Sequence, residues 1–219
     1  MLHLAIVFAL FVTGASAAPT NDWTIVPGKR VGPITALTTR ADLTTIFGLK
    51  NVIDEDVTLS DEGSEPGTIV FKDQADASLT ITWNDDRPDP RIEVIVFCLA
   101  LSGLPSKCRW HTAEGITFGT TLKHLQALNG GNFAILGFGW DYGGTVTSWQ
   151  GGRLDKLKTN CGSFNVRLDP PPATPSDTRA AAIEQVEGDR EFTSAEPAME
   201  ALDPQVSYMS FSFGKCVPD

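Results

Sequence analysis

The stretch GITFGTTLKHLQALNG, residues 115–130, repeats a pattern that begins 82 residues earlier as PITALTTRADLTTIFG, residues 33–48. Aligned without gaps, the two stretches share six identical positions, namely Ile34/Ile116, Thr35/Thr117, Thr38/Thr120, Thr39/Thr121, Leu43/Leu125 and Gly48/Gly130. A single offset that preserves both polar and apolar positions indicates an internal repeat. The sequence therefore predicts two copies of one structural unit.

Each copy is expected to begin with a short capped helix. The threonine pairs at 38–39 and 120–121 offer hydroxyl oxygens that accept hydrogen bonds from the first N–H groups of a helix. Asp42 stands three residues after the second threonine of the first pair, as in a capping box. Gly48 and Gly130 stand where a left-handed residue ends a helix. The apolar residues between these ends share one helical face, which must lie against a sheet.

Three strand-like segments follow each helix. After the first helix come TIVF, SLTITW and RIEVIVF; after the second come NFAILGFGW, GTVTSW and SFNVRL. Apolar and polar residues alternate in SLTITW, which is typical of a strand with one buried face. These patterns predict an α+β fold of two tandem helix-plus-antiparallel-sheet repeats, over residues 18–100 and 101–169, whose sheets lie side by side.

Residues 170–219 are expected to extend the second repeat. The prolines of DPPPATPSDT predict a stiff connector. RAAAIEQVEG is expected to form a helix that ends at Gly188, and QVSYMSFSF a last strand. Because Met209, Phe211 and Phe213 share one face of that strand, it is expected to dock on the second repeat.

Residues 1–17 are typical of a secretory signal peptide, because the nine-residue apolar core LAIVFALFV leads into a small-residue cleavage pattern. That core is too short to span a bilayer, and no other segment is apolar enough. The expected location is secreted or periplasmic. Four cysteines in an exported chain predict two disulfides, for which three pairings are open. We favour Cys98–Cys108, across the turn-like CLALSGLPSKC, and Cys161–Cys216.

The net charge of −10 comes mostly from residues 51–90, which contain eleven acidic and two basic residues. An acidic surface repels phosphate groups, so nucleic acid is not an expected partner. The run DEDVTLSDEGSEPG lacks the spacing of the twelve-residue calcium loop, and a solvated acidic loop is the expected structure. Without a CxxC pattern or paired histidines, we expect neither a metal nor another cofactor.

Residues 130–152, GGNFAILGFGWDYGGTVTSWQGG, contain eight glycines and five aromatic residues. One interpretation is an aromatic platform for a sugar, a peptide or a protein surface, with Asp141 as its polar anchor. In this interpretation Trp140 and Tyr142 lie at a hairpin end beside Phe138, and Trp149 faces them across the turn. The other interpretation is that the glycines make room for aromatic side chains that pack the sheet against the helices.

Catalytic motifs such as GxSxG, HExxH and GxxxxGK[ST] are absent from the sequence. Asp141 with Asp155 is the candidate carboxylate pair for glycoside hydrolysis, which needs carboxyl groups about 5–9 Å apart. The shape of the surface around Trp140 distinguishes a binding function from glycoside hydrolysis. A shallow aromatic patch favours binding, whereas a deep pocket with two carboxylates favours hydrolysis.

The line from Gly115 to Gly130, repeated in a unit of helix and sheet, resembles the beta-lactamase-inhibitor-protein type of fold. It also resembles the small domain of outer-membrane assembly lipoproteins. The resemblance covers about residues 30–168 and implies a binding scaffold whose target is not specified. We therefore expect an exported non-enzymatic module that binds a protein or a cell-envelope component. The alternatives are a small extracellular hydrolase of polysaccharide or peptide polymers and a purely structural envelope protein.

Overall fold

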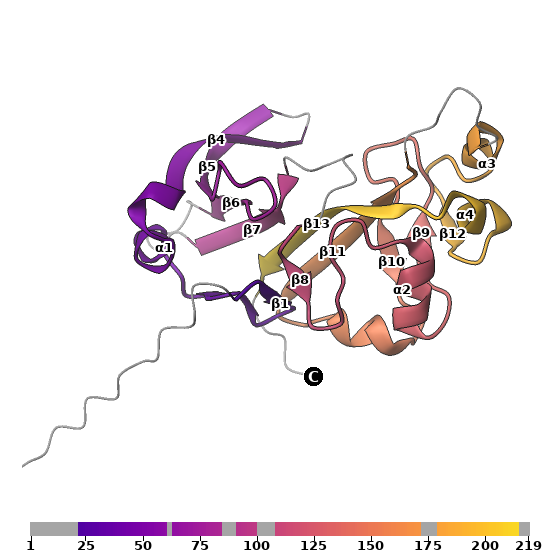
Figure 1. Ribbon diagram of the computed structural model, residues 1–219, viewed down its shortest axis with the longest axis horizontal. Coiled ribbons are helices and arrows are strands. Elements are labelled where there is room, and N and C mark those ends of the chain that lie inside the picture. Colours follow the sequence, from indigo (N-terminus) through magenta and orange to yellow (C-terminus); the bar gives the residue numbers. More distant parts are fainter. Residues whose placement is uncertain (1–21, 61–62, 85–90, 100–107, 172–178, 215–219) are drawn as a thin grey trace, which may run out of the picture.

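The largest element of the computed structural model, which describes residues 22–60, 63–84, 91–99, 108–171 and 179–214, is a six-stranded antiparallel sheet. In spatial order its strands are β11 (Gly162–Asp169), β13 (Gln205–Phe213), β7 (Arg91–Phe97), β6 (Leu79–Asn84), β5 (Gly63–Val70) and β4 (Val52–Ser60). Helices lie beside antiparallel sheets (Figure 1), so the α+β class is confirmed. The predicted signal peptide lies outside the described residues.

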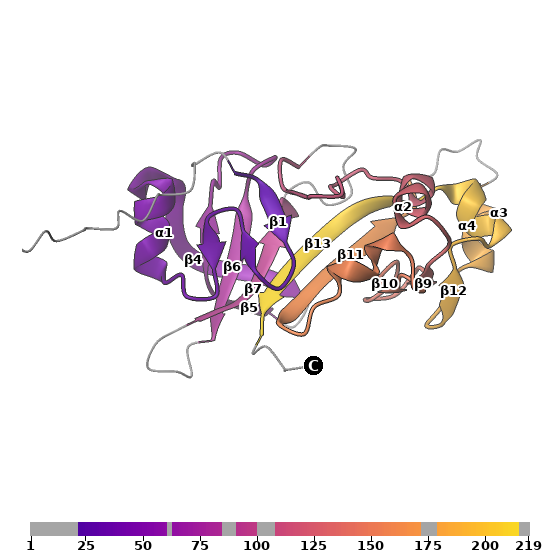
Figure 2. The same ribbon diagram turned by 90° about the horizontal axis from the view of Figure 1, so that it is seen from below.

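The last strand, β13, lies inside this sheet rather than at its edge. It pairs with β11 over eight residue pairs and with β7 over two. Figure 2 shows β13, in yellow, running between β7 and β11. Docking on β11 agrees with the expectation from the sequence, whereas pairing with β7 was not predicted. Strands from both predicted repeats therefore belong to one sheet.

Two smaller sheets are formed by shorter strands. One has the order β3 (Ile34–Thr35), β2 (Arg30–Val31), β1 (Thr24–Val26) and β8 (His111–Thr112), with β1 and β8 parallel. The other has the order β10 (Val146–Ser148), β9 (Ala134–Leu136) and β12 (Glu191–Thr193). The expected sheet of β9, β10 and β11 is therefore wrong. The long strand β13 offers β11 more backbone partners than the three-residue β10 does.

A helix forms at each place that the repeat predicts: α1 (Arg40–Phe47) and α2 (Leu122–Asn129). The Thr39 hydroxyl accepts a hydrogen bond from the Asp42 N–H, and the Asp42 carboxylate accepts one from the Thr39 N–H, which completes the capping box. At α2 the Thr121 hydroxyl accepts from the His124 N–H at 3.2 Å. Each helix ends at the predicted glycine, which has a positive φ.

The turns that precede α1 and α2 have the same hydrogen bonds. The Thr38 hydroxyl accepts from the Thr35 N–H at 2.9 Å, and the Thr120 hydroxyl accepts from the Thr117 N–H at 3.1 Å. In both turns the second threonine also donates its N–H to the carbonyl oxygen of the first. These bonds explain why threonine occupies both positions in both turns.

The remaining helical segments are η1 (Leu49–Asn51), η3 (Arg153–Leu157), α3 (Arg179–Gln185) and α4 (Pro197–Leu202). The α3 helix forms within the predicted RAAAIEQVEG segment. None of the helices in the described ranges combines the length and the apolar character that crossing a bilayer requires.

An apolar layer on one face of the six-stranded sheet includes a fully buried tryptophan. Trp110 donates its indole N–H to the Ala77 carbonyl oxygen at 2.8 Å. Its ring meets Trp23 edge to face, with centroids 4.9 Å apart, and lies 5.9 Å from the ring of Phe97 on β7. Trp110 therefore packs the segment around Trp23 against the six-stranded sheet.

The acidic run is part of a hairpin, so the expectation of a solvated loop is wrong. Asp54 and Glu55 lie on β4, which pairs with β5 at the edge of the sheet. The Asp54 carboxylate accepts from the Thr68 hydroxyl at 2.5 Å, and Lys72 donates to Glu55 at 2.7 Å. These partners hold acidic side chains on a strand, and charge on an edge strand discourages pairing with another chain.

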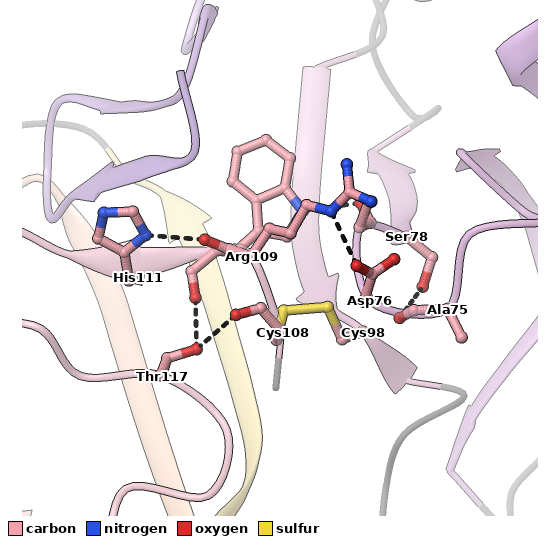
Figure 3. Close-up of a disulfide and its surroundings, with 10 residues drawn as sticks. Ala75, Asp76, Ser78, Cys98, Cys108, Arg109, His111 and Thr117 are labelled. Carbon is pink, nitrogen blue, oxygen red and sulfur yellow. Dashed lines mark hydrogen bonds and ion pairs between the residues drawn. A yellow bond between two sulfur atoms is a disulfide. The ribbon is translucent and has the colours of Figure 1, made fainter. Parts of the chain in front are cut away.

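The predicted disulfide between Cys98 and Cys108 is confirmed. Figure 3 shows its surroundings, where Arg109 pairs with Asp76 at 2.8 Å and the Thr117 hydroxyl donates to the Cys108 carbonyl oxygen at 2.9 Å. The disulfide thus connects the end of β7 to the segment that precedes β8. Cys161 is not a free thiol, and its predicted partner, Cys216, lies outside the described residues.

An ion pair between Glu114 and Lys156 of η3, with 2.9 Å between Oε1 and Nζ, predicts a pH effect. Burial raises the pKa of Glu114, but the Lys156 ammonium and hydrogen bonds outweigh it and hold the pKa below the usual 4.5. The resulting stability is present above about pH 4.5 and is lost as the pH falls through the folded-state pKa. Because Lys156 is largely exposed, we expect it to amount to at most about 1 kcal/mol.

Lys156→Met is expected to raise the pKa of Glu114 and to flatten the acid dependence of unfolding below pH 4.5. Carbon-detected NMR titration of Glu114 and urea unfolding at several pH values measure both effects. Lys123→Met, which removes one positive charge from the surface of α2, is the control. An unchanged Glu114 pKa in Lys156→Met would contradict the assignment.

Candidate binding site

The loop between β9 and β10, residues 137–145, is held by backbone hydrogen bonds on two sides. On one side the Phe138 N–H donates to the Val186 carbonyl oxygen at 2.9 Å, and the Gly188 N–H donates to the Phe138 carbonyl oxygen at 3.0 Å. On the other side the Leu168 N–H donates to the Gly144 carbonyl oxygen at 2.9 Å. These bonds attach the loop to β11 and to the segment between α3 and β12, so its backbone is fixed in place.

Glycines in this loop permit close contact between backbones. A Cβ atom on Gly144 would lie 1.8 Å from the Leu168 carbonyl oxygen, and one on Gly137 would lie 2.6 Å from the Gly188 carbonyl oxygen. Gly137 has a second reason to lack a side chain, because a Cβ there would also lie 2.7 Å from the ring of Phe192. In this loop, close contact between neighbouring backbones therefore explains the glycines better than room for aromatic side chains does.

The loop presents three residues that we call the Trp140 tip: Trp140, Asp141 and Tyr142. A tight turn, closed by the Gly143 N–H donating to the Trp140 carbonyl oxygen at 2.9 Å, places them at the end of the hairpin. Trp140 is half-buried, whereas Asp141 is exposed and Tyr142 is 64% exposed. The two rings meet edge to face with centroids 5.5 Å apart. The tip is thus a shallow aromatic surface with one carboxylate.

The other two predicted site residues, Phe138 and Trp149, are buried, with 4% and 6% of their surface exposed. The β9–β10 register places Trp149 at the opposite end of the hairpin from the tip. There its ring packs against Phe133, with centroids 5.3 Å apart, and its carbonyl oxygen accepts a hydrogen bond from the Asn129 side chain at 3.0 Å. The expectation that Trp149 faces the Trp140 tip is therefore corrected.

Neither of two clefts on the molecule is an acidic pocket. One, of about 270 Å³, lies beside α1, and the other, of about 230 Å³, lies between β10 and β11. Neither cleft is lined by Asp141 or Asp155, and neither brings two carboxylates together. Asp155 instead pairs with Lys158 at 2.8 Å. Within the described ranges, no three His, Cys, Asp or Glu side chains gather in a way that could hold a metal ion.

The cleft between β10 and β11 was missed by sequence reasoning. It is lined by Ser148 and Trp149 on one side and by Ser163 and Asn165 on the other. Its walls are two segments that the strand pattern predicts to be hydrogen-bonded neighbours. No local signal in the sequence could have indicated that they separate.

Comparison of the chain with protein-family models, with curated proteins and with solved structures finds no match. The resemblance to the beta-lactamase-inhibitor-protein type of fold therefore stays a prediction.

Proposed function

We propose that the protein is an exported, non-enzymatic binding module that holds a protein or a cell-envelope component at the Trp140 tip. The observation that carries this proposal is an aromatic pair, half-buried Trp140 against exposed Tyr142, on a loop whose backbone is already fixed. Tryptophan and tyrosine are enriched at binding hot spots because they combine a large apolar area with a polar atom. A loop that is ordered beforehand also loses little conformational entropy on binding.

The proposal includes a scaffold of two tandem repeats. The matching caps and entry turns of α1 and α2 support it. The second copy differs from the first, because its strands belong to two sheets. β9 and β10 lie in the three-stranded sheet, and β11 lies in the six-stranded sheet. The plan resembles the beta-lactamase-inhibitor-protein type, which implies a scaffold for binding. The Cys98–Cys108 disulfide is compatible with a secreted or periplasmic location, where disulfides persist.

Trp140→Ala and Tyr142→Ala are each expected to weaken binding about 30-fold or more, which corresponds to a hot-spot loss of about 2 kcal/mol. The thermal midpoint is expected to change by less than about 3 °C in Tyr142→Ala, because that side chain is largely exposed. A larger fall of about 3–6 °C is expected in Trp140→Ala, because the half-buried indole donates its N–H to the Gly137 carbonyl oxygen at 2.9 Å. The measurement compares retention by the immobilised proteins of a solubilised envelope fraction from the source organism and of a panel of glycans.

Leu49→Ala is the matched control, because it removes an apolar side chain that is 79% exposed on η1, away from the loop. Retention that survives both tip variants and is lost in Leu49→Ala would move the binding surface to the first copy. Turnover of a glycan or peptide polymer that depends on Asp141 would instead replace the binding proposal with hydrolysis.

A further inference from the structure

The strands β10 and β11 are edge strands of different sheets that approach each other. β10 ends the three-stranded sheet, and β11 ends the six-stranded sheet. They meet at an antiparallel bridge between Thr145 and Arg167. Between residues 146–149 and 162–165, all of which the structure describes, no backbone hydrogen bond continues this pairing. The two sheets are thus joined at one end and separate beyond it.

The cleft of about 230 Å³ begins where this pairing stops. Residues 146–149 form one wall, residues 162–165 form the other, and residues 157–159 contribute to the end far from the bridge. Four residues of strand extend about 13 Å at roughly 3.3 Å per residue. The cleft therefore has the length of three to four residues of extended peptide.

The lining of the cleft favours an uncharged peptide. Trp149 and Phe164 supply apolar surface, and Ser148 and Asn165 supply hydroxyl and amide groups. The charged lining residue, Lys158, is neutralised by an ion pair of 2.8 Å with a carboxylate of η3. An extended chain in which small polar and apolar residues alternate presents both kinds of side chain to such walls.

We propose that this cleft accepts an extended peptide segment of a partner protein, which pairs with the free edges of β10 and β11. Edge strands present rows of N–H and C=O groups, and an added strand is a known way of satisfying them. The bound segment would join the two sheets in the order β12-β9-β10-peptide-β11-β13-β7-β6-β5-β4. Because the cleft and the Trp140 tip are separate surfaces, this proposal does not depend on the function proposed for the tip.

The probe is a positional-scanning library of acetylated, amidated hexapeptides in which small polar and apolar residues alternate, applied to the full chain. The tightest member is expected to slow hydrogen exchange by about tenfold or more at the cleft-facing amides of residues 146–148 and of Phe164, since the Ser163 N–H already donates to Ser212 of β13. N-methylation of alternate peptide nitrogens is expected to weaken binding by about tenfold or more, because it removes backbone donors. Binding that is unchanged by N-methylation, or no protection by any member, would overturn the proposal.

Two variants at one position locate the bound peptide. Asn165→Trp fills the cleft and is expected to weaken binding by about tenfold or more. Asn165→Ala loses the same hydrogen bond to Ser210, of 3.2 Å, and the amide that lines the cleft, but leaves the cleft open, so it is expected to weaken binding by about threefold or less. If Asn165→Trp does not fold, the N-methylated peptides decide the question on the natural chain. Peptide binding that is lost in Trp140→Ala, or protection of these amides by oligosaccharides alone, would also reject the proposal.

Discussion

Replacing Trp110 with alanine is expected to lower the free energy of unfolding by about 3–5 kcal/mol, the range found for large aromatic residues removed from cores. Trp110 is fully buried, so the change leaves a cavity between the N-terminal residues and the sheet. It also removes the edge-to-face contact with Trp23 and leaves the Ala77 carbonyl oxygen without its indole donor. For a chain of this size, the thermal midpoint is expected to fall by roughly 10 °C or more.

Urea unfolding of two further variants separates the causes of this loss. Trp110→Phe keeps most of the apolar volume but removes the donor to Ala77, and is expected to cost about 1–3 kcal/mol. Trp140→Ala, which removes the same side-chain type from a half-buried position where its indole N–H donates to Gly137, is expected to cost about 1–2 kcal/mol. Equal losses in Trp110→Ala and Trp140→Ala would show that Trp110 is not a core residue.

Replacing Gly144 with alanine is expected to lower the free energy of unfolding by about 2–4 kcal/mol. The new Cβ would lie 1.8 Å from the Leu168 carbonyl oxygen, so the loop has to move away from β11. That movement breaks the hydrogen bond from Leu168 to Gly144 and the Thr145–Arg167 bridge. The φ of 74° at Gly144 adds strain of about 1–2 kcal/mol for a residue with a side chain.

Gly115→Ala isolates the contribution of backbone strain. Gly115 has a φ of 92°, but a Cβ there would meet nothing within 4 Å. The difference between the two variants in urea unfolding therefore reports the clash with β11. Gly144→Ala is also expected to weaken binding at the Trp140 tip, because the tip loses its fixed backbone. Equal stability losses would mean that the loop is not held against β11.

The helix caps can be predicted from the sequence because each depends on residues a few positions apart. Thr39 reaches Asp42, and Thr121 reaches the backbone of His124, within a single turn. The Cys98–Cys108 disulfide is predictable for a similar reason, since a short turn-like segment brings its ends together. In each case the residues that make the contact lie close together in the chain.

Strand partners cannot be predicted in this way, because they are chosen among segments far apart in the chain. The segments of β9, β10 and β11 read as consecutive strands, yet β11 takes β13 as its partner and β9 takes β12. The acidic strand β4 has no apolar alternation to mark it, and its carboxylates are accommodated by Thr68 and Lys72. In the first case the long strand β13 offers β11 more backbone partners than β10 does. In the second case Thr68 and Lys72 supply partners for the carboxylates of β4.

The candidate site shows the same division between local and distant information. The glycine and aromatic pattern locates the Trp140 tip, because the tip depends on one loop. It does not separate Trp140 from Trp149, since both are tryptophans of the same glycine-rich stretch. Burial of Trp149 is set by Phe133 and Asn129, which lie 16 and 20 residues earlier in the chain.

The position of β13 between β7 and β11 has a consequence for biosynthesis. More than a hundred residues separate the end of β7 at Phe97 from the start of β13 at Gln205. At translation rates of about 5–20 residues per second, the ribosome needs roughly 5–20 s to cover that interval. For those seconds the nascent chain carries β7 without its later neighbour, and a holding chaperone has time to engage it before the sheet closes.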